Sequence, residues 1–201
     1  MTRARPYDRE EALDAAMTLF WRKGFHATSL KDLENALNMK PGSIYAAFNS
    51  KEALYLATLE RYFERNRDAL RQMAEASPSP LKALADHLRS FAGEDGAKPA
   101  CRACMLIKTL LTATEEDDAI ATQARHYLDA MTEEIRAIFE KAKTLGELPE
   151  SADPARLAQR YQADMTALRI ETHRAPATPA LKALAEDMAQ EVEGMRTWHA
   201  A

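Results

Sequence analysis

Residues 28–51 read TSLKDLENALNMKPGSIYAAFNSK, and this stretch decides the fold of the N-terminal part of the chain. Ser29 is followed three residues later by Asp32, a spacing in which the two side chains cap the first turn of a helix. Asn38 tolerates the positive φ of a tight turn better than most residues, and Pro41 suits the first position of the helix that follows. The stretch therefore predicts two short helices joined by a tight turn, which is a helix-turn-helix unit.

The residues before this stretch predict one more helix, and the apolar positions predict how the helices pack. Asp8 caps a helix that stops at Gly24, where two basic residues followed by a glycine are typical of a helix end. Leu33, Leu37 and Ile44 are then expected to form a small apolar cluster between the second and third helices. A third helix anchored in this way exposes the polar atoms of its first turn.

The rest of the chain reads as further helices separated by proline, glycine or acidic turns. The periodic segments are, in chain order, 51–74, 81–92, 102–114, 120–142, a segment that starts at Pro154, and 181–195. We find no segment with the two-residue alternation of a β-strand. The predicted fold class is therefore all-α, with about nine helices.

Composition and charge exclude several classes of protein. The 201 residues are 46% hydrophobic and 29% charged, which is typical of a soluble globular protein. Residues 1–51 carry 8 Lys and Arg against 6 Asp and Glu, whereas the whole chain has a net charge of −4, so we expect nucleic-acid contact at the N-terminal end alone. No apolar run approaches the ~18 residues of a membrane span, and the N-terminus lacks the apolar stretch of a secretory signal. The 2 cysteines are too few for a disulfide framework, so we expect a cytoplasmic protein with reduced thiols.

The helix-turn-helix stretch resembles a known family of regulators. Residues 28–33, TSLKDL, and residues 42–54, GSIYAAFNSKEAL, are similar to the corresponding parts of the TetR/AcrR family of bacterial transcriptional regulators. The pattern is specific because a small hydroxyl residue, an aliphatic residue, a tyrosine, a phenylalanine and a Lys-Glu-x-Leu run must all keep their spacing. The resemblance covers the region from about residue 8 to residue 62.

The resemblance implies a dimer of all-helical subunits. In such a protein, residues 1–51 form a helix-turn-helix DNA-binding domain, and residues 52–201 form a helical domain for ligand binding and dimerisation. The implied function is that of a ligand-responsive repressor, which binds a palindromic operator in double-stranded DNA and is released by a small apolar effector or by cysteine modification. We expect no enzymatic activity, no cofactor and no metal.

The candidate DNA contacts lie at the starts of three helices. Lys40 and Ser43 are near the exposed start of the third helix, where side chains reach base edges. Tyr45 and Lys51 are expected to contact phosphates, Lys51 together with the amides at the start of the fourth helix. With their neighbours and the start of the second helix, the candidate set is Thr28, Ser29, Lys40, Pro41, Gly42, Ser43, Tyr45 and Lys51.

Two arginines ahead of the first helix extend this set, and three residues depart from the family. Arg3 and Arg5 are placed to reach a minor groove or the DNA backbone, and solvated surface charges are the other interpretation. Asn38, Lys40 and Pro41 differ from the residues that are common at these positions of the family. The operator sequence therefore does not follow from the resemblance.

The last two segments carry complementary apolar stripes joined by a proline-rich turn. Two such hairpins can pack into a four-helix interface, or the stripes can close the core of a single subunit, and the resemblance favours the interface. The candidate interface residues are Leu157, Tyr161, Met165, Leu184, Met188 and Val192.

Cys101 and Cys104 form a C-x-x-C pattern at the start of a helix. A helix N-terminus and nearby cations lower the pKa of a thiol, so a sensor of oxidants or electrophiles is one interpretation, and a pair of packed or exposed thiols is the other. No second pair of ligands with zinc spacing follows, and no βαβ pattern surrounds the motif as in thioredoxin-like enzymes. The candidate residues for sensing or for an apolar ligand pocket are Cys104, Cys101, Met105, Tyr127 and Met131.

Two alternative functions stay open. One is a thiol-based redox enzyme that uses Cys101 and Cys104, which turnover of a disulfide or an electrophile would identify. The other is a helical interaction module whose N-terminal helices do not bind DNA, which failure to shift operator-length DNA in a gel would identify.

Overall fold

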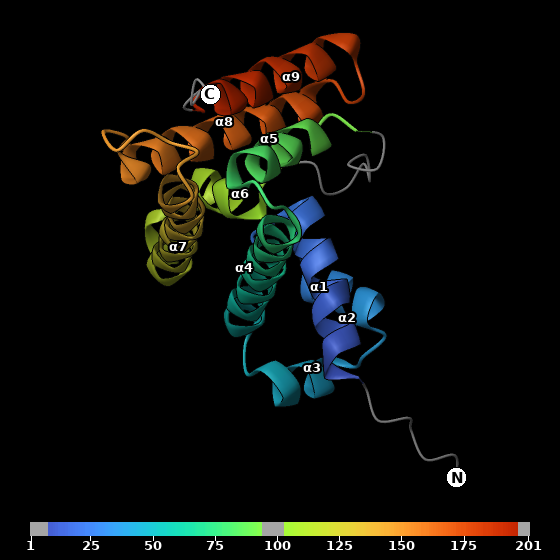
Figure 1. Ribbon diagram of the computed structural model, residues 1–201. Helices are drawn as coiled ribbons and strands as arrows, with labels where there is room; N and C mark the ends of the chain where they lie inside the picture. The colour runs from blue at the N-terminus through green and yellow to red at the C-terminus, as the bar shows by residue number, and fades with distance from the viewer. Residues whose placement is uncertain (1–7, 94–102, 197–201) are drawn as a thin grey trace. The chain divides into compact units, whose positions relative to one another are not determined.

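The computed structural model describes residues 8–93 and 103–196, which form the set of helices in Figure 1. Within these residues there are nine α-helices and a short 3-10 helix, which confirms the all-helical prediction. In chain order they are α1 (Arg9–Lys23), α2 (Leu30–Leu37), α3 (Pro41–Phe48), α4 (Lys51–Ala76), α5 (Pro80–Ser90), α6 (Met105–Thr112), the 3-10 helix η2 (Glu115–Asp117), α7 (Asp118–Thr144), α8 (Pro154–Arg174) and α9 (Pro179–Gly194). No helix in this described part is both long and apolar enough to cross a membrane.

The caps predicted from the sequence determine where the first helices begin and end. The Ser29 hydroxyl oxygen accepts the Asp32 amide at 3.1 Å, and the Asp32 carboxylate accepts the Ser29 amide at 2.8 Å, so the predicted capping box starts α2. Asn38 follows α2 with φ 51°, in the left-handed region, and Pro41 is the first residue of α3. The predicted helix-turn-helix is therefore confirmed.

The helix predicted over residues 102–114 is shorter in the structure. Its described part, α6, ends at Thr112. Thr114 starts a separate turn, because its amide at 2.7 Å and its hydroxyl at 2.8 Å both donate to the Asp117 carboxylate. This second capping box separates α6 from α7, and apolar periodicity does not reveal it.

The chain divides into two compact units. The first unit comprises residues 1–64 and 105–127, and the second comprises residues 65–104 and 128–201, so that α4 and α7 contribute to both. The functional boundary predicted after residue 51 is a different division and stays a prediction. The structural division adds α6 and the start of α7 to the unit that contains the helix-turn-helix.

The core of the first unit is a cluster of aliphatic and aromatic side chains. Leu33 and Ile44 are 1% and 2% exposed, as predicted, whereas Leu37 is half-buried. Phe20 of α1 meets Tyr55 of α4 edge to face, with 4.9 Å between the ring centroids. These contacts hold the first four helices around one centre.

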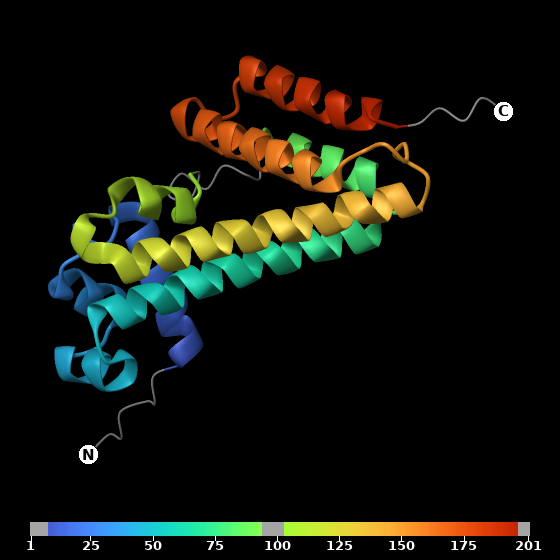
Figure 2. The same cartoon turned by 90° about the vertical axis from the view of Figure 1, so that its left-hand side faces the viewer.

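The core of the second unit contains α5, α8 and α9, which lie alongside one another in Figures 1 and 2. The hydroxyl of Tyr161 in α8 donates to the carbonyl oxygen of Leu84 at 2.9 Å and lies 2.9 Å from Nδ1 of His87, both in α5. Because the phenol gives its single proton to a carbonyl, Nδ1 must carry the proton of the imidazole. Burial lowers the pKa of His87 to about 4, so this ring is neutral at pH 7.

Candidate nucleic-acid interface

Helix α3 has one apolar face and one exposed face. Ile44 and Phe48, four residues apart, are 2% and 4% exposed and anchor the helix in the core. Gly42 and Ser43 are exposed, and Tyr45 is exposed to 45%. Gly42, Ser43 and Tyr45 therefore point away from the core, as a recognition helix requires.

The first turn of α3 is open on its outer side. Lys40 is the exposed N-cap residue, with extended backbone and no side-chain cap, and Pro41 is half-buried. A Cβ added to Gly42 would meet nothing within 4 Å. The fold itself gives no reason for a glycine at this position, whereas a partner that approaches the backbone closely would.

The start of α2 combines an exposed cap with a buried neighbour. Ser29 is exposed, and its hydroxyl donates to the Asp32 carboxylate at 2.7 Å. Lys23 of α1 donates to the same carboxylate at 2.7 Å, and this contact holds the pKa of Asp32 well below its usual range. Thr28 is fully buried, and its hydroxyl donates to the Gly24 carbonyl oxygen at 2.7 Å. The Thr28 side chain therefore belongs to the core, and the contact predicted for Thr28 with DNA stays a prediction.

Lys51, the first residue of α4, is half-buried. Its ammonium group lies 4.5 Å from the centroid of the Phe25 ring, which is a cation–π geometry. Burial lowers the pKa of Lys51, and the charges of Asp117 and Asp32 oppose this shift. Residues of its own unit thus already hold the ammonium group that was predicted to meet a phosphate.

Asp117 joins the α6–α7 connection to the α1–α2 connection, a contact that sequence reasoning missed. Asp117 is 8% exposed, and its carboxylate lies 2.7 Å from Nε2 of His26. The Thr114 amide, followed by the Thr114 hydroxyl and His26, holds the pKa of Asp117 below its usual range. The spacing of Thr114 and Asp117 is visible in the sequence, but His26 is 91 residues away from Asp117 and no local pattern links them.

Two further long-range contacts tie α6 to α1 and α4. Nζ of Lys108 donates to the carbonyl oxygens of Trp21 and Arg22 at 2.9 and 3.0 Å, and so caps the last turn of α1. The buried hydroxyls of Tyr55 and Thr109 lie 2.7 Å apart. Within the first unit, α6 therefore supports the helix that precedes the helix-turn-helix.

Two arginines tie α1 to α3 and to α4. Nη1 of Arg9 donates to the Ala47 carbonyl oxygen at 3.1 Å. Arg61 of α4 pairs with both Asp14 and Glu10 of α1. Neither contact follows from a local sequence pattern, because the partners lie 38 to 51 residues apart.

The residues predicted for a dimer interface form two groups in the second unit. The buried group, which belongs to the core of its own subunit, is Tyr161, Met165 and Val192, at 2%, 6% and 3% exposed. The half-buried group is Leu157, Leu184 and Met188. For the buried group, the structure matches the other interpretation of the stripes, in which they close the subunit's own core.

The outward face of α8 carries two small side chains and one larger apolar residue. Ala163 is exposed, Ala167 is half-buried, and Ile170 is 51% exposed. These three residues are spaced four and three positions apart, so they form one stripe along the helix, and the exposed Gln159 precedes them on the same face. Small side chains in such a stripe allow a second helix to approach closely.

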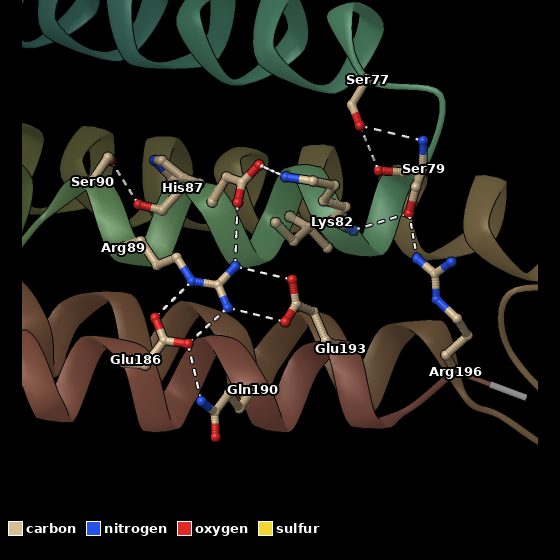
Figure 3. Close-up of polar contacts among 12 residues, drawn as sticks. Ser77, Ser79, Lys82, His87, Arg89, Ser90, Glu186, Gln190, Glu193 and Arg196 are labelled. Carbon is tan, nitrogen blue, oxygen red and sulfur yellow. Dashed lines mark hydrogen bonds and ion pairs between the residues drawn. The ribbon is translucent and has the colours of Figure 1, made fainter.

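Arg89 of α5 joins α9 through carboxylates, as Figure 3 shows. Its guanidinium group pairs with Glu186 at 2.8 and 3.0 Å and with Glu193 at 2.9 and 3.0 Å, and it reaches Asp86 at 3.2 Å. The contact with Arg89 lowers the pKa of Glu186 to about 2. Because Glu186 and Glu193 are two turns apart on one flank of α9, Arg89 fixes the rotation of α9 about its own axis. Leu184 and Met188 lie on the other flank.

The apolar residues predicted for a ligand pocket lie in the cores of the units. Met105 and Tyr127 in the first unit are 1% and 9% exposed, and Met131 in the second is 8% exposed. Tyr127 stacks on Phe63 with 4.7 Å between the ring centroids, and burial raises its pKa.

The cysteines and the N-terminal arginines are only partly covered by the structure. Cys104 is a free, half-buried thiol immediately before α6. Cys101, Arg3 and Arg5 lie outside the described residues. Among the residues that are described, no group of three or more His, Cys, Asp or Glu side chains could hold a metal ion.

The chain is similar in sequence to known regulatory proteins. Residues 12–58 match the sequence model of the tetR family of bacterial regulatory proteins. The HTH-type transcriptional repressor ComR of Escherichia coli K12 is 34% identical over 165 residues, which cover 79% of this chain and 77% of ComR. The repressor BdcR of the same strain is 29% identical over 124 residues, covering 62% of this chain and 63% of BdcR.

Solved structures share the fold over nearly the whole chain. A cysteine mutant of the TetR family regulator CifR, in complex with a 26-base-pair operator duplex, has a TM-score of 0.83 and 28% identity, and the match covers 94% of this chain and 98% of that one. A TetR family regulator from Cytophaga hutchinsonii has a TM-score of 0.81 at 23% identity, covers 94% of both chains and supports the fold alone. The chain therefore belongs to the tetR family of bacterial regulatory proteins, which are regulators and not enzymes.

Proposed function

We propose that this chain is a transcriptional repressor that binds a palindromic operator as a homodimer. The observation that carries the proposal is the exposed first turn of α3, with Ser43 and Tyr45 outward, Ile44 and Phe48 inward, and a glycine at 42 that the fold does not require. Two relatives are named transcriptional repressors, and the relative CifR has been crystallised on operator DNA. Operator binding also requires that the protein act in the cytoplasm, where the bacterial chromosome is.

The exposed residues divide into two kinds of contact. Lys40 and Ser43 are the candidates for base edges in the major groove. Tyr45 and Ser29 have hydroxyls suited to phosphate oxygens, and Lys51 supplies a cation beside the N-terminal amides of α4. Pro41 and Gly42 carry no donor side chain, and their contribution is the close approach of the backbone.

The proposed dimer uses the outward stripe of α8 and the apolar flank of α9. The stripe holds Ala163, Ala167 and Ile170, and the flank holds Leu184 and Met188. Arg89 supports this arrangement because it holds the opposite flank of α9 against α5. A dimer would carry two recognition helices and read two half-sites ~34–36 Å apart, or somewhat more, on the DNA.

Release from DNA is proposed to follow binding of a small apolar molecule in the helical body or modification of Cys104 and Cys101. Cys104 supports the second route because it is a free thiol beside α6, whose Lys108 and Thr109 contact α1 and α4. Alkylation of the wild-type chain is expected to weaken operator binding, and alkylation of the Cys104→Ser, Cys101→Ser double variant is not. Equal operator affinity before and after alkylation of the wild type would exclude the thiol route.

The experiment that tests the function is selection of a duplex from a random-sequence library by the wild-type chain. We expect enrichment of a palindrome, affinity that falls steeply with salt, and a dimer in sedimentation equilibrium. Ile170→Glu should give a folded monomer that binds the palindrome poorly, whereas Leu145→Glu, at an exposed position after α7, should leave the dimer intact. A wild-type chain that enriches no sequence would instead favour a helical interaction module.

A further inference from the structure

We propose that Asp117 is a positioning residue for operator binding, because it holds the α1–α2 connection through His26 and thereby sets the pose of α2 and α3. The inference rests on the proposed function, since it assigns a role in DNA binding to a residue outside the helix-turn-helix. Asp117 does not contact DNA in this proposal, and it acts through His26.

The contact between Asp117 and His26 has a defined direction. Asp117 is an ionised carboxylate, because Thr114 donates its amide at 2.7 Å and its hydroxyl at 2.8 Å to the same oxygen that faces His26. An ionised carboxylate only accepts hydrogen bonds, so Nε2 of His26 must carry a proton and donate it. The contact is therefore a charge-assisted hydrogen bond, which is stronger than one between neutral groups.

The α1–α2 connection, which Asp117 holds, also contacts residues of α4. The ring of Phe25 lies 5.0 Å from that of Tyr55 and 5.2 Å from that of His26, measured between centroids. The Lys51 ammonium group stands 4.5 Å from the Phe25 ring on the same connection. Asp117 thus supports a connection that contacts two elements which the proposed function places at the DNA, the helix-turn-helix and the start of α4.

A displacement of His26 would be passed on to α2. The Thr28 amide donates to the Phe25 carbonyl oxygen at 3.3 Å, and the Thr28 hydroxyl donates to Gly24 at 2.7 Å, so residues 24–28 are tied together. Ser29, the cap of α2, comes next in the chain. Because a tight turn then joins α2 to α3, the recognition helix follows the position of α2.

The acidic turn around Asp117 offers a matched control. Glu115, Glu116 and Asp118 are exposed, whereas Asp117 is buried. Removing the charge of any of these residues changes the net charge by the same amount, and removing a negative charge generally favours binding to DNA. The long-range charge effect and the positioning effect therefore have opposite signs.

The test compares Asp117→Asn with Asp118→Asn on two duplexes, the one enriched by the wild-type chain and a scrambled duplex of the same composition. We expect Asp117→Asn to bind the enriched duplex about tenfold more weakly, and to bind the scrambled duplex as well as the wild type or slightly better, with an unchanged slope of affinity against salt. Asp118→Asn should bind both duplexes as well as the wild type or slightly better. Equal affinity of the two variants for the enriched duplex would overturn the proposal.

Two further measurements keep the test decisive. His26→Ala and Asp117→Asn should not be additive in a double-mutant cycle, because both act on the same contact, and additive effects would count against the pair. If Asp117→Asn does not fold, His26→Ala takes its place, since the His26 side chain is 53% exposed and its loss leaves the Asp117 cap in place.

Amide hydrogen exchange separates this inference from the proposed function. In the folded chain without DNA, Asp117→Asn should exchange faster over residues 24–37 and Asp118→Asn should not. If the wild type enriches no duplex, the proposed function fails, while this result still decides whether Asp117 holds the α1–α2 connection and α2 in place. Unchanged exchange over these residues would overturn it.

Discussion

Helices α3 and α8 both carry apolar stripes, but the stripes have different consequences. The eight-residue helix α3 packs against one small hydrophobic cluster. Ile44 and Phe48 therefore turn inward, and the neighbouring polar and small residues turn outward. In α8 the 21 residues have a buried stripe that includes Tyr161 and Met165, and a separate outward stripe of two alanines with Ile170. A short helix on a small core has few ways to bury its apolar residues, whereas a long helix can present apolar residues to two partners.

Adjacent residues of α3 give the largest expected contrast. Ile44→Ala should lower the free energy of unfolding by about 2–5 kcal/mol, because it leaves a cavity in the cluster. Tyr45→Ala, one residue later and 45% exposed, should change stability little and weaken DNA binding at all sequences. Urea unfolding and fluorescence anisotropy with the enriched duplex measure the two effects. Similar losses of stability would show that the two faces of α3 are not distinct.

The second unit should lose stability in mild acid through His87. Its pKa falls from the usual 6.5 to about 4 in the folded chain, because burial disfavours the charged ring. The unfolded chain therefore takes up this proton first, so the contribution is complete above pH 6.5 and is lost as the pH falls toward 4. Since the residue is only half-buried, we expect a loss of about 2 kcal/mol.

Urea unfolding across this pH range, followed by a probe in the second unit, measures the His87 effect. His87→Phe should remove it, and His173→Gln, which changes an exposed histidine of α8, should not. Equal acid sensitivity in the wild type and His87→Phe would assign the effect to other groups.

Substitutions of Tyr161 and Ile170 should distinguish the roles of the buried and the outward stripe of α8. Tyr161→Phe should cost about 1–2 kcal/mol of stability, because the Leu84 carbonyl and the Nδ1 hydrogen of His87 lose their partner, and the dimer should persist. Ile170→Glu should have the reverse pattern, with the dimer weakened and the stability of the subunit nearly unchanged. Thermal melts at several protein concentrations distinguish the two, since dissociation makes the melting temperature depend on concentration. Loss of the dimer in Tyr161→Phe would return the buried stripe to the interface.

Gly42→Ala should have the smallest effect on the fold. The added Cβ meets nothing within 4 Å, and alanine is a better helix former than glycine by up to about 1 kcal/mol, so stability should stay the same or rise slightly. Operator affinity should fall, because the methyl group keeps the backbone of α3 away from the DNA. Unchanged affinity in a gel shift would remove Gly42 from the interface.

The parts of the site that were predictable depend on contacts close in sequence. The capping box of Ser29 and Asp32, the left-handed Asn38 and the first-turn Pro41 each act within a few residues, so their spacing predicts their geometry. The Arg89 contacts with Glu186 and Glu193 span 97 and 104 residues, and the contact of His26 with Asp117 spans 91, so neither has a local pattern. The bond from the Thr28 hydroxyl to the Gly24 carbonyl oxygen was not predicted, because a hydroxyl at a helix start is equally suited to cap the helix or to bond the backbone behind it.

The sequence by itself determined the all-helical class, the helix-turn-helix and the residues at its exposed turn, because caps, turns and periodicity are properties of neighbouring residues. Only the tertiary structure decided which apolar stripe closes the subunit. It also decided that Lys108 and Asp117 support the N-terminal helices, and that α6 belongs to the same unit as the helix-turn-helix. These choices depend on which distant side chains meet. Burial and long-range pairing arise when the helices pack, and the spacing of residues along one helix does not determine them.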